Sequence, residues 1–590
     1  MPFINEAVWN VSPDISVPPV VLSDIIKNTD KNLLVIAGPG TGKTELLAQK
    51  ACFLLQTGNC NYPRKILTLC FKVDAAANIK ERVAERCGFI AEKAFASMTF
   101  DSFFISIVRR FSCFLPTWIT QPNNNFEVGP FNNYSFPLDL NSEVADNVKE
   151  KINSCIKENK LTWLLCRSLA YSIIKNSNEV KKIITSTYGN IFLDEFQDTT
   201  KEQYQFIKEI FYNRTNKIIA VGDTNQTIMR WAGADIEIFN KFKHDFKAKD
   251  YHLNINHRSN KNIVDFINYV GKNIKNSDEN FVEYVATRES TKENSIFANK
   301  YKNKEEEATA IASYINNEIK NNNTLKGNDF ALIIRQKTQD YYDAVANIFK
   351  SYNLEIRNED REIYNGGLRI QDIVEEPLSN LFLNILRKKA KIINPRDNNN
   401  MYYTYSQLRN VDISNERQYK KLVDEIRNII EQIDYNNGIE SITNTIISKL
   451  GNNIRRYKIL SNESDYKKIK KSFDIYFQEC LDECLNIENA INKYIGENQI
   501  KLMTVHKSKG LEFETVFFVD FNIGSWWGLN NAYRNNDSTR VIEEKNTFFV
   551  GASRARENLI FTNGEATKNW PPVITKIMAD SKMIKLFEQR

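Results

Sequence analysis

The residues with the clearest chemical potential form a glycine-rich run between an apolar stretch and a helical pattern. Glycines let such a loop curl until its backbone N–H groups point at phosphate oxygens, at the positive end of the following helix. The Lys43 ammonium can reach the β- and γ-phosphates, and the Thr44 hydroxyl can hold Mg²⁺. The run therefore predicts a nucleoside triphosphate site, although alanine stands at the first position, where the strict pattern has glycine. Its residues are Ala37, Gly38, Pro39, Gly40, Thr41, Gly42, Lys43 and Thr44.

Two adjacent acids follow the apolar run Ile191–Leu193. An acid at the end of a buried strand beside a phosphate loop is placed to bind the metal, and a second acid next to it can deprotonate an attacking water. We therefore assign Asp194 as the metal-side carboxylate and Glu195 as the general base. The alternative is a charged strand-to-helix turn without chemistry, which the phosphate loop upstream disfavours.

A third run, Val221–Ile228 (VGDTNQTI), is followed by Trp231–Ala234 (WAGA). Together with AGPGTGKT and DEFQD, these runs resemble the UvrD/Rep/PcrA group of superfamily 1A DNA helicases. Further matches follow in the family's order and spacing, from about Leu33 to Phe561. They are Ile66–Val83, Thr99–Phe103, Leu253–Ser259, Met503–Phe513 and Phe549–Glu557.

The resemblance implies roles for residues outside the phosphate loop, with ATP and Mg²⁺ as the nucleotide and the metal. Gln226 matches the family's γ-phosphate sensor. Arg258 and Arg554 match two arginines that neutralise charge developing on the transferring phosphoryl group. Glu512 matches an acid near the ribose and the sensor network.

The resemblance also implies contacts to single-stranded or partly duplex DNA. Aromatic rings that stack on bases tolerate any sequence, which suits a translocase. For Phe71 the alternative is a core position, because it ends a strand. The residues at the matching positions are Phe71, Thr99, Phe100, Trp231, Thr504 and His506.

Several positions depart from the family pattern. Leu22 stands near the place of a glutamine that reads adenine, so the choice of base is open. Asp74 and Asp101 put acids where the family presents Asn-Lys or histidine, which weakens the attraction for a phosphodiester backbone. Met229 and Ala232 replace a tyrosine and an arginine. The residues for hydrolysis are thus intact, whereas those that handle DNA are eroded.

Short apolar runs alternate with helical patterns, which predicts βαβ units and parallel sheets. The strand-like runs are Leu33–Ile36, Ile66–Phe71, Ile191–Leu193, Ile218–Val221, Ala331–Ile334, Val516–Val519 and Asn558–Phe561. Between about Leu378 and Asn498 strand signals are few. Apolar residues at helical spacing from Tyr419 to Ile433 predict a helix there, with Ser414 as its cap.

The resemblance implies an α/β fold with two RecA-like parallel-sheet cores, each carrying an inserted, mostly helical subdomain. The first core would take residues 1–104 and 183–256, with 105–182 inserted. The second would take 257–374 and 499–590, with 375–498 inserted.

Composition narrows the class of protein. The 590 residues are 42% hydrophobic and 26% charged, which excludes a mainly disordered chain, and they contain no run long enough for a membrane helix. The formal net charge of +6 is too small to indicate a nucleic-acid partner by itself. Nine scattered cysteines without a CxxC pair predict reduced thiols in a cytoplasmic protein, and the first residues do not read as a secretory signal.

Two hypotheses of function follow. The first is an ATP-dependent single-stranded DNA translocase and 3′→5′ helicase. The second is a helicase-like, ATP- and DNA-sensing subunit of an antiviral defence complex of the Gabija type, in which a partner subunit supplies the nuclease. The matches at Met503–Phe513 and Trp231 support the first hypothesis, whereas the short chain, the eroded DNA motifs and the compact second insertion resemble the second. A simple kinase or GTPase leaves the later motifs unexplained. ATPase rates with and without single-stranded DNA separate the two hypotheses.

Overall fold

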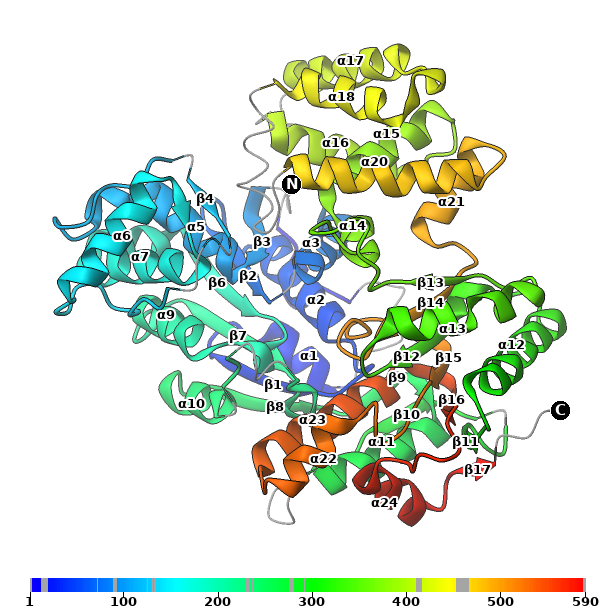
Figure 1. The fold of residues 1–590 in the computed structure, drawn as a ribbon. Coiled ribbons are helices and arrows are strands. Elements are labelled where there is room, and N and C mark those ends of the chain that lie inside the picture. Colours follow the sequence, from blue (N-terminus) through cyan, green and yellow to red (C-terminus); the bar gives the residue numbers. More distant parts are fainter. Residues whose placement is uncertain are drawn as a thin grey trace. The chain divides into compact units, whose positions relative to one another are not determined.

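The computed structural model describes residues 3–11, 20–71, 73–88, 93–124, 126–129, 131, 134–228, 233–235, 237–274, 281–290, 292–409, 416–451 and 466–586. The chain divides into two compact units, one of residues up to Leu253 and one of most of the chain from Asn254 onward. Each unit contains one large sheet in which every pair of neighbouring strands is parallel (Figure 1). The expectation of an α/β fold with two parallel-sheet cores is confirmed.

The sheet of the first unit has six strands in the order β3-β2-β6-β7-β1-β8. The strands β1, β6 and β7 lie next to one another in its middle. Because both of their faces are covered, these strands read as nearly continuous apolar runs. The strands are β1 (Leu33–Ala37), β2 (Lys65–Cys70), β3 (Phe95–Thr99), β6 (Tyr188–Leu193), β7 (Lys217–Gly222) and β8 (Lys249–Leu253), and the helices that connect them include α1 (Val20–Lys27), α2 (Lys43–Gln56), α3 (Val73–Cys87), α9 (Lys201–Phe211) and α10 (Ile238–Asp245).

The segment predicted as the first insertion is mostly helical. It consists of α5 (Phe100–Phe111), α6 (Asp146–Lys157), α7 (Trp163–Asn176), α8 (Asn178–Thr187) and a short parallel pair, β4 (Glu127–Val128) with β5 (Lys160–Leu161). The helices α5 and α8 run across the predicted boundaries at residues 104 and 182. Side chains of these helices share one hydrophobic core with the sheet, so the insertion continues the packing of the first unit.

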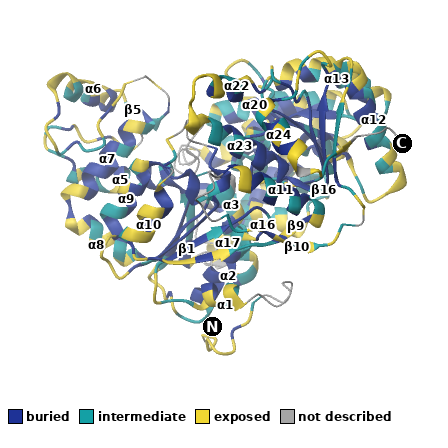
Figure 2. Cartoon of the chain, turned by 90° about the horizontal axis from the view of Figure 1, so that it is seen from below, coloured by how far each residue is buried: buried dark blue, intermediate teal, exposed yellow. Residues whose placement is uncertain are grey.

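The sheet of the second unit has seven strands in the order β13-β14-β12-β15-β16-β11-β17. Figure 2 shows its strands buried and the outward faces of its helices exposed. The strands are β11 (Ile296–Lys300), β12 (Phe330–Ile334), β13 (Ile356–Asn358), β14 (Ile500–Thr504), β15 (Phe513–Phe518), β16 (Ala555–Asn563) and β17 (Lys585–Leu586), beside a separate pair, β9 (Ile255–Asn260) and β10 (Val285–Arg288). The helices are α11 (Lys261–Ile274), α12 (Lys304–Asn321), α13 (Thr338–Ser351), α22 (Trp527–Arg534), α23 (Ser538–Ala552) and α24 (Pro572–Ser581).

Between β13 and β14 the described residues form helices and no strand. These helices are α14 (Ile370–Glu375), α15 (Pro377–Lys389), α16 (Pro395–Arg409), α17 (Glu416–Gln432), α18 (Gly438–Leu450), α20 (Tyr466–Asp482) and α21 (Ile487–Ile495). The helix predicted from apolar spacing is confirmed as α17, which buries Leu422, Ile426 and Ile429. Its proposed cap, Ser414, lies outside the described residues.

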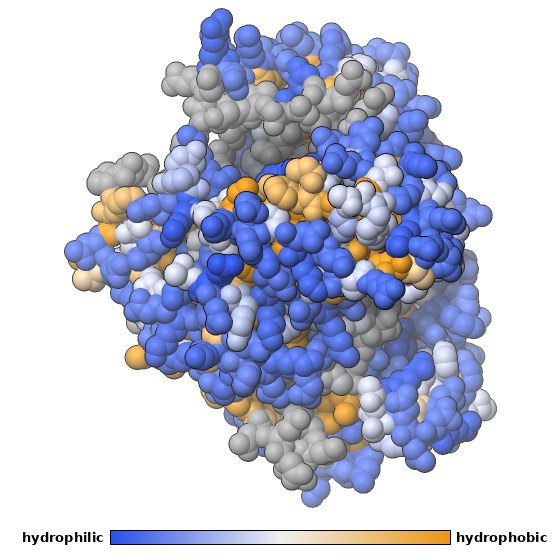
Figure 3. Space-filling model, turned by 90° about the vertical axis from the view of Figure 1, so that its left-hand side faces the viewer, coloured by the Kyte–Doolittle hydropathy of each residue, from blue (hydrophilic) through white to orange (hydrophobic). Residues whose placement is uncertain are grey.

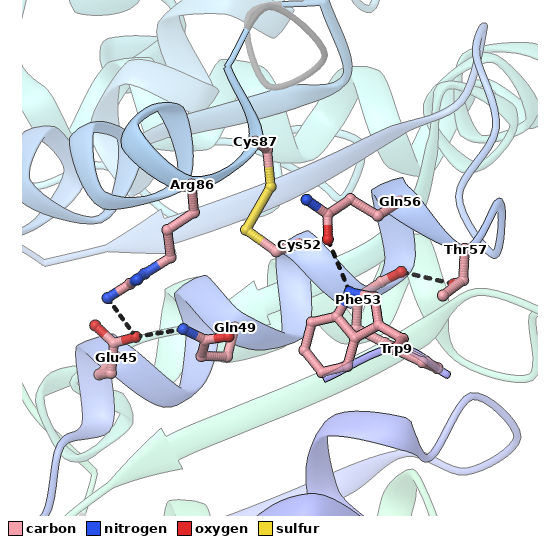
Figure 4. The surroundings of a disulfide bond; sticks show 9 residues. All are labelled: Trp9, Glu45, Gln49, Cys52, Phe53, Gln56, Thr57, Arg86 and Cys87. Carbon is pink, nitrogen blue, oxygen red and sulfur yellow. Dashed lines mark hydrogen bonds and ion pairs between the residues drawn. A yellow bond between two sulfur atoms is a disulfide. The ribbon is translucent and has the colours of Figure 1, made fainter. Parts of the chain in front are cut away.

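Two cysteines of the first unit are joined by a disulfide, Cys52 on α2 and Cys87 on α3 (Figure 4). The expectation of reduced thiols was therefore wrong for this pair. The two residues are 35 positions apart, so no short sequence motif predicts their pairing. Packing of α2 against α3 places their Cα atoms 5.9 Å apart. Glu45 on α2 reinforces this contact through ion pairs with Arg82 and Arg86 on α3.

Within the described part of the chain, no helix combines the length and the apolar character needed to cross a membrane. The face seen in Figure 3 is mostly hydrophilic, with hydrophobic side chains in small, separate areas.

Candidate active site

The candidate active site of the first unit lies where three neighbouring parallel strands end. The phosphate loop follows β1, the acidic pair follows β6, and Asp223 follows β7. Parallel strands end at the same edge of a sheet, so the loops after adjacent strands meet there, which is the usual place for ligands in such folds. The order β6-β7-β1 therefore brings together residues that are up to about 190 positions apart in the sequence.

The phosphate loop is built by glycines in left-handed conformations and by its own hydrogen bonds. Gly40 and Gly42 have φ angles of 69° and 81°, which side chains disfavour. The Thr41 hydroxyl donates to the Gly38 carbonyl at 2.9 Å, and the Lys43 ammonium donates to the carbonyls of Ala37 and Gly38, both at 3.3 Å. Lys43 thus lies over the loop that is expected to hold the phosphates.

The departure at position 37 has a simple structural reason. Ala37 is the last residue of β1 and is fully buried in the core of the first unit. Its methyl group packs in that core, and the left-handed turns of the loop fall later, at Gly40 and Gly42, so alanine is accommodated at this position.

The acidic pair is held tightly at the end of β6. Asp194 is 4% exposed, and its backbone N–H donates to the Leu69 carbonyl on β2 at 3.1 Å. Glu195 has a φ of 47°, and its N–H donates to the Asp194 carboxylate at 2.9 Å. Burial, together with the negative charges of Asp194 and Glu195, raises the pKa of the Cys70 thiol well above its ordinary value. Cys70 therefore stays a neutral thiol beside the acids.

Asp223, the third residue of the VGDTNQTI run, completes this charged group, although its place in the sequence did not predict a role for it. Its carboxylate accepts a hydrogen bond from the Gln226 amide at 2.8 Å, and both side chains are buried. Burial raises the pKa of Asp223, the positive charge of Lys43 opposes this rise, and the negative charge of Glu195 adds to it. Lys43, Glu195, Asp223 and Gln226 thus belong to one electrostatic cluster. An acid directly after a strand that neighbours the phosphate-loop strand is the signal that could have identified Asp223.

The oxygen donors of this edge fit Mg²⁺. Thr44 lies in the first turn of α2 and offers a hydroxyl, and Asp194 offers a carboxylate. Mg²⁺ is commonly held by one or two such groups while phosphate oxygens and waters complete its octahedron. Among the residues that the structure describes, no group of three or more histidines, cysteines and acids is placed to hold a metal ion.

The second unit assembles the arginines and the acid expected at the nucleotide. Arg258 donates to the Glu512 carboxylate at 2.7 Å and to the Ser553 carbonyl at 3.0 Å. Arg554 is buried and donates to the carbonyls of Val550 and Leu511 at 2.9 and 3.3 Å. The three predicted residues are therefore neighbours within one unit.

Arg556 is a member of this cluster that the sequence reasoning missed. Its guanidinium pairs with the second carboxylate oxygen of Glu512. Burial alone would raise the pKa of Glu512, but the charges and hydrogen bonds of Arg258 and Arg556 outweigh it and lower that pKa. In the sequence, Arg556 could be suspected only because it is a second arginine two residues after Arg554.

The residues expected to contact nucleic acid fall into different environments. Phe71 is half-buried after β2, and Thr99, at the end of the neighbouring β3, accepts a hydrogen bond from the Ser102 N–H and so caps α5. Phe100 is 2% exposed in the hydrophobic core, which favours packing over base stacking. Trp231 lies outside the described residues.

In the second unit, Thr504 ends β14 and His506 follows it; both are partly exposed. The Thr504 N–H donates to the Asp360 carboxylate at 2.9 Å, which fixes the start of this turn.

Among the departures from the family pattern, Asp101 is explained by its partner. Both of its carboxylate oxygens accept hydrogen bonds from Arg167 on α7, at 3.0 and 3.3 Å. The acid is thus neutralised within the first unit. Leu22 lies in α1 and packs against the core. Met229, Ala232 and the side chain of Asp74 are outside the described residues.

Comparison with known proteins agrees with this architecture. The UvrD/REP helicase N-terminal domain matches residues 22–118 and 120–247, and the UvrD-like helicase C-terminal domain matches residues 251–365 and 375–565. Similar proteins include a probable DNA helicase II homolog of Mycoplasma capricolum, at 24% identity over 91% of this chain and 83% of that protein. The ATP-dependent DNA helicase Rep of Buchnera aphidicola is 25% identical over 90% of both chains, and the ATP-dependent DNA helicase PcrA of Staphylococcus aureus is 23% identical over 95% of this chain and 86% of its own.

Proposed function

The chain belongs to the UvrD/Rep helicase family, and on that premise we propose that it hydrolyses ATP to move 3′→5′ along single-stranded DNA and to unwind duplexes. The observation that carries the proposal is the meeting of the phosphate loop, the Asp194–Glu195 pair and the Asp223–Gln226 pair at one edge of a parallel sheet. The names of Rep and PcrA as ATP-dependent DNA helicases support the assignment of DNA as the track.

In the proposed reaction the first unit binds the triphosphate and activates water. The loop N–H groups and Lys43 hold the β- and γ-phosphates. Glu195 accepts a proton from a water whose oxygen attacks the γ-phosphorus, the bond from that phosphorus to the β–γ bridging oxygen breaks, and ADP leaves. Mg²⁺, held by Thr44 and Asp194, would neutralise charge on the phosphate oxygens.

We assign transition-state stabilisation to Arg258 and Arg554 of the second unit. A guanidinium directed at the transferring phosphoryl group neutralises charge that is largest in the transition state. The pairing of Arg258 with Glu512 supports this role, because an arginine held in one conformation loses little freedom when it binds an anion. Gln226 is the proposed γ-phosphate sensor.

For DNA we retain Phe71, Thr99, Trp231, Thr504 and His506 as proposed contacts. Aromatic stacking and polar contacts to the strand do not read sequence, so they suit movement along any DNA. Phe100 is not retained as a stacking residue, because its ring packs in the core.

The rival hypothesis of an antiviral complex with a nuclease partner gains no support from the relatives described above, because their names mention neither antiviral defence nor a nuclease. It is therefore not proposed.

The test measures ATP hydrolysis and unwinding by the purified chain. We expect single-stranded DNA to stimulate hydrolysis and a duplex with a 3′ tail to be unwound, while the same duplex with a 5′ tail is not. The Glu195→Gln variant is the control for contaminating ATPase. Hydrolysis indifferent to DNA would contradict the motor, and unwinding of the 5′-tailed substrate alone would reverse its direction.

A further inference from the structure

Gln197 follows the acidic pair by two residues and is completely buried, yet the proposed reaction gives it no role. It lies in a 3₁₀ turn, Phe196–Asp198, that is closed by the Asp198 N–H donating to the Glu195 carbonyl at 2.9 Å. Glu195 itself has a left-handed backbone, with φ at 47°, a conformation that residues other than glycine rarely adopt. The surroundings must hold such a residue in place, and the contacts of Gln197 are part of those surroundings.

The side-chain amide of Gln197 bridges Glu195 to the end of β7. The backbone N–H of Asp223 donates to Gln197 Oε1 at 3.0 Å. A backbone N–H can only donate, so it must face the amide oxygen, and the amide nitrogen must face the other way. There Nε2 donates to a carboxylate oxygen of Glu195. The chemistry of the two neighbours therefore fixes the orientation of the amide.

Gly222 leaves the space that this bridge occupies. A Cβ atom added to Gly222 would lie 2.4 Å from Gln197 Oε1, closer than atoms can approach without a shift, and would also crowd the ring of Phe239 at 3.0 Å. The amide of Gln197 thus sits in a place that any other residue at position 222 would close. This is independent support for a built position of Gln197.

On the far side of the bridge lies the proposed γ-phosphate sensor. The Asp223 carboxylate accepts the Gln226 amide at 2.8 Å, and the Gln226 N–H donates to the Asp223 carbonyl at 3.0 Å. A continuous series of hydrogen bonds therefore runs from Glu195 through Gln197 and Asp223 to Gln226. All four side chains lie in the first unit.

We propose that Gln197 is a positioning residue for hydrolysis, which aligns the Glu195 carboxylate with the attacking water and ties it to the loop that carries Gln226. The inference rests on the proposed function, because it assumes that Glu195 is the base. Gln197 does not touch the nucleotide in this scheme. Its loss should slow turnover and leave nucleotide binding intact, since misplacing a catalytic group affects the reaction step more than binding.

The first variants separate the two bonds of the amide. Gln197→Met keeps the volume and loses both bonds. Gln197→Glu keeps the acceptor for the Asp223 N–H but puts a second carboxylate against Glu195 in place of the donor. We expect kcat for DNA-stimulated ATP hydrolysis to fall about 10- to 100-fold in both, with KM for ATP within about twofold of wild type.

Gln203 provides a matched control. It is a buried glutamine in the same segment, and its side-chain oxygen accepts the backbone N–H of Thr200 in the capping box of α9. Gln203→Met should lower the melting temperature and leave kcat within about twofold of wild type. Melting temperatures and ATP affinities of all variants identify any loss that comes from misfolding.

The decisive measurement combines changes at Gln197 and Glu195. If Gln197 acts through Glu195, the Glu195→Gln/Gln197→Met double variant should turn over no more slowly than Glu195→Gln alone, because the group to be positioned is already inactive. Wild-type kcat in both Gln197 variants, or a further loss in the double variant, overturns the inference. An inactive wild-type chain would instead contradict the proposed function.

Discussion

Replacing Glu512 with glutamine is expected to slow ATP hydrolysis about tenfold, because Glu512 holds the arginine assigned to the phosphoryl group. The Arg258–Glu512 contact is 2.7 Å and Arg258 is 12% exposed, whereas Arg556, on the other carboxylate oxygen, is 42% exposed and adds little. A hydrogen bond to a charged partner contributes about 1.5–3 kcal/mol, and a neutral amide retains about half of it. Because the Glu512 side chain is 37% exposed, solvent weakens its interactions, and we expect the variant to lose about 1.4 kcal/mol of transition-state stabilisation. This loss corresponds to a tenfold lower rate.

The assay is steady-state ATP hydrolysis with saturating single-stranded DNA, and the matched control is Arg556→Met. This control removes the exposed partner and leaves Arg258 paired, so its kcat should stay within about twofold of wild type. The folded-state pKa of Glu512 lies below its ordinary value, so the carboxylate is charged throughout the assay range and its interactions weaken only under more acidic conditions. The ratio of wild-type to Glu512→Gln rates should therefore be constant between about pH 6 and pH 9. An unchanged kcat, or a ratio that varies within that range, would refute this reasoning.

Four further changes test other parts of the structure. Lys43→Ala should abolish tight ATP binding in a titration, because the loop loses its cation; unchanged affinity would contradict the site. Glu195→Gln should keep ATP affinity and lose about 10²- to 10⁴-fold in turnover, and near-normal turnover would move the base elsewhere. Asp101→Ala should release Arg167 and steepen the salt dependence of DNA affinity, whereas an unchanged slope would place Arg167 away from the strand. Burial lowers the pKa of Lys50 to about 7, so the folded state binds this proton more weakly than the unfolded state, and the stability of the folded protein should rise from about pH 7 to pH 10. In Lys50→Met this rise in the melting temperature with pH should be absent. Identical plots of melting temperature against pH for the variant and the wild type would contradict this prediction.

The strands that could be predicted from sequence are the central ones. Val35, Ile191 and Val516 lie in continuous apolar runs because both faces of their strands are covered. Strands such as β3 and β8 gave no comparable signal, since they lie at the edges of their sheet and carry polar residues. Edge strands are defined by pairing with a neighbour, which composition does not encode.

In the candidate site, the residues within recognisable runs could be named in advance, but their partners could not. The bond from Gln197 to Asp223 and the pair of Asp101 with Arg167 join residues that are 26 and 66 positions apart. Such contacts depend on which loops the sheet order brings together. For Phe100 the motif was clear from the sequence, but the burial of its ring was not, because that burial depends on how α5 packs against the core.

The link between Cys52 and Cys87 makes the chain between them a closed covalent ring of two helical segments and the strand β2. A break of the main chain at any point within this ring leaves both fragments attached until the disulfide is reduced. Closing a loop of 35 residues also lowers the conformational entropy of the unfolded chain. In the chain-entropy description, this stabilises the folded state by about 4 kcal/mol. The helix that begins with Lys43 is therefore covalently tied to α3 through Cys52, so the two helices stay joined even in the unfolded chain.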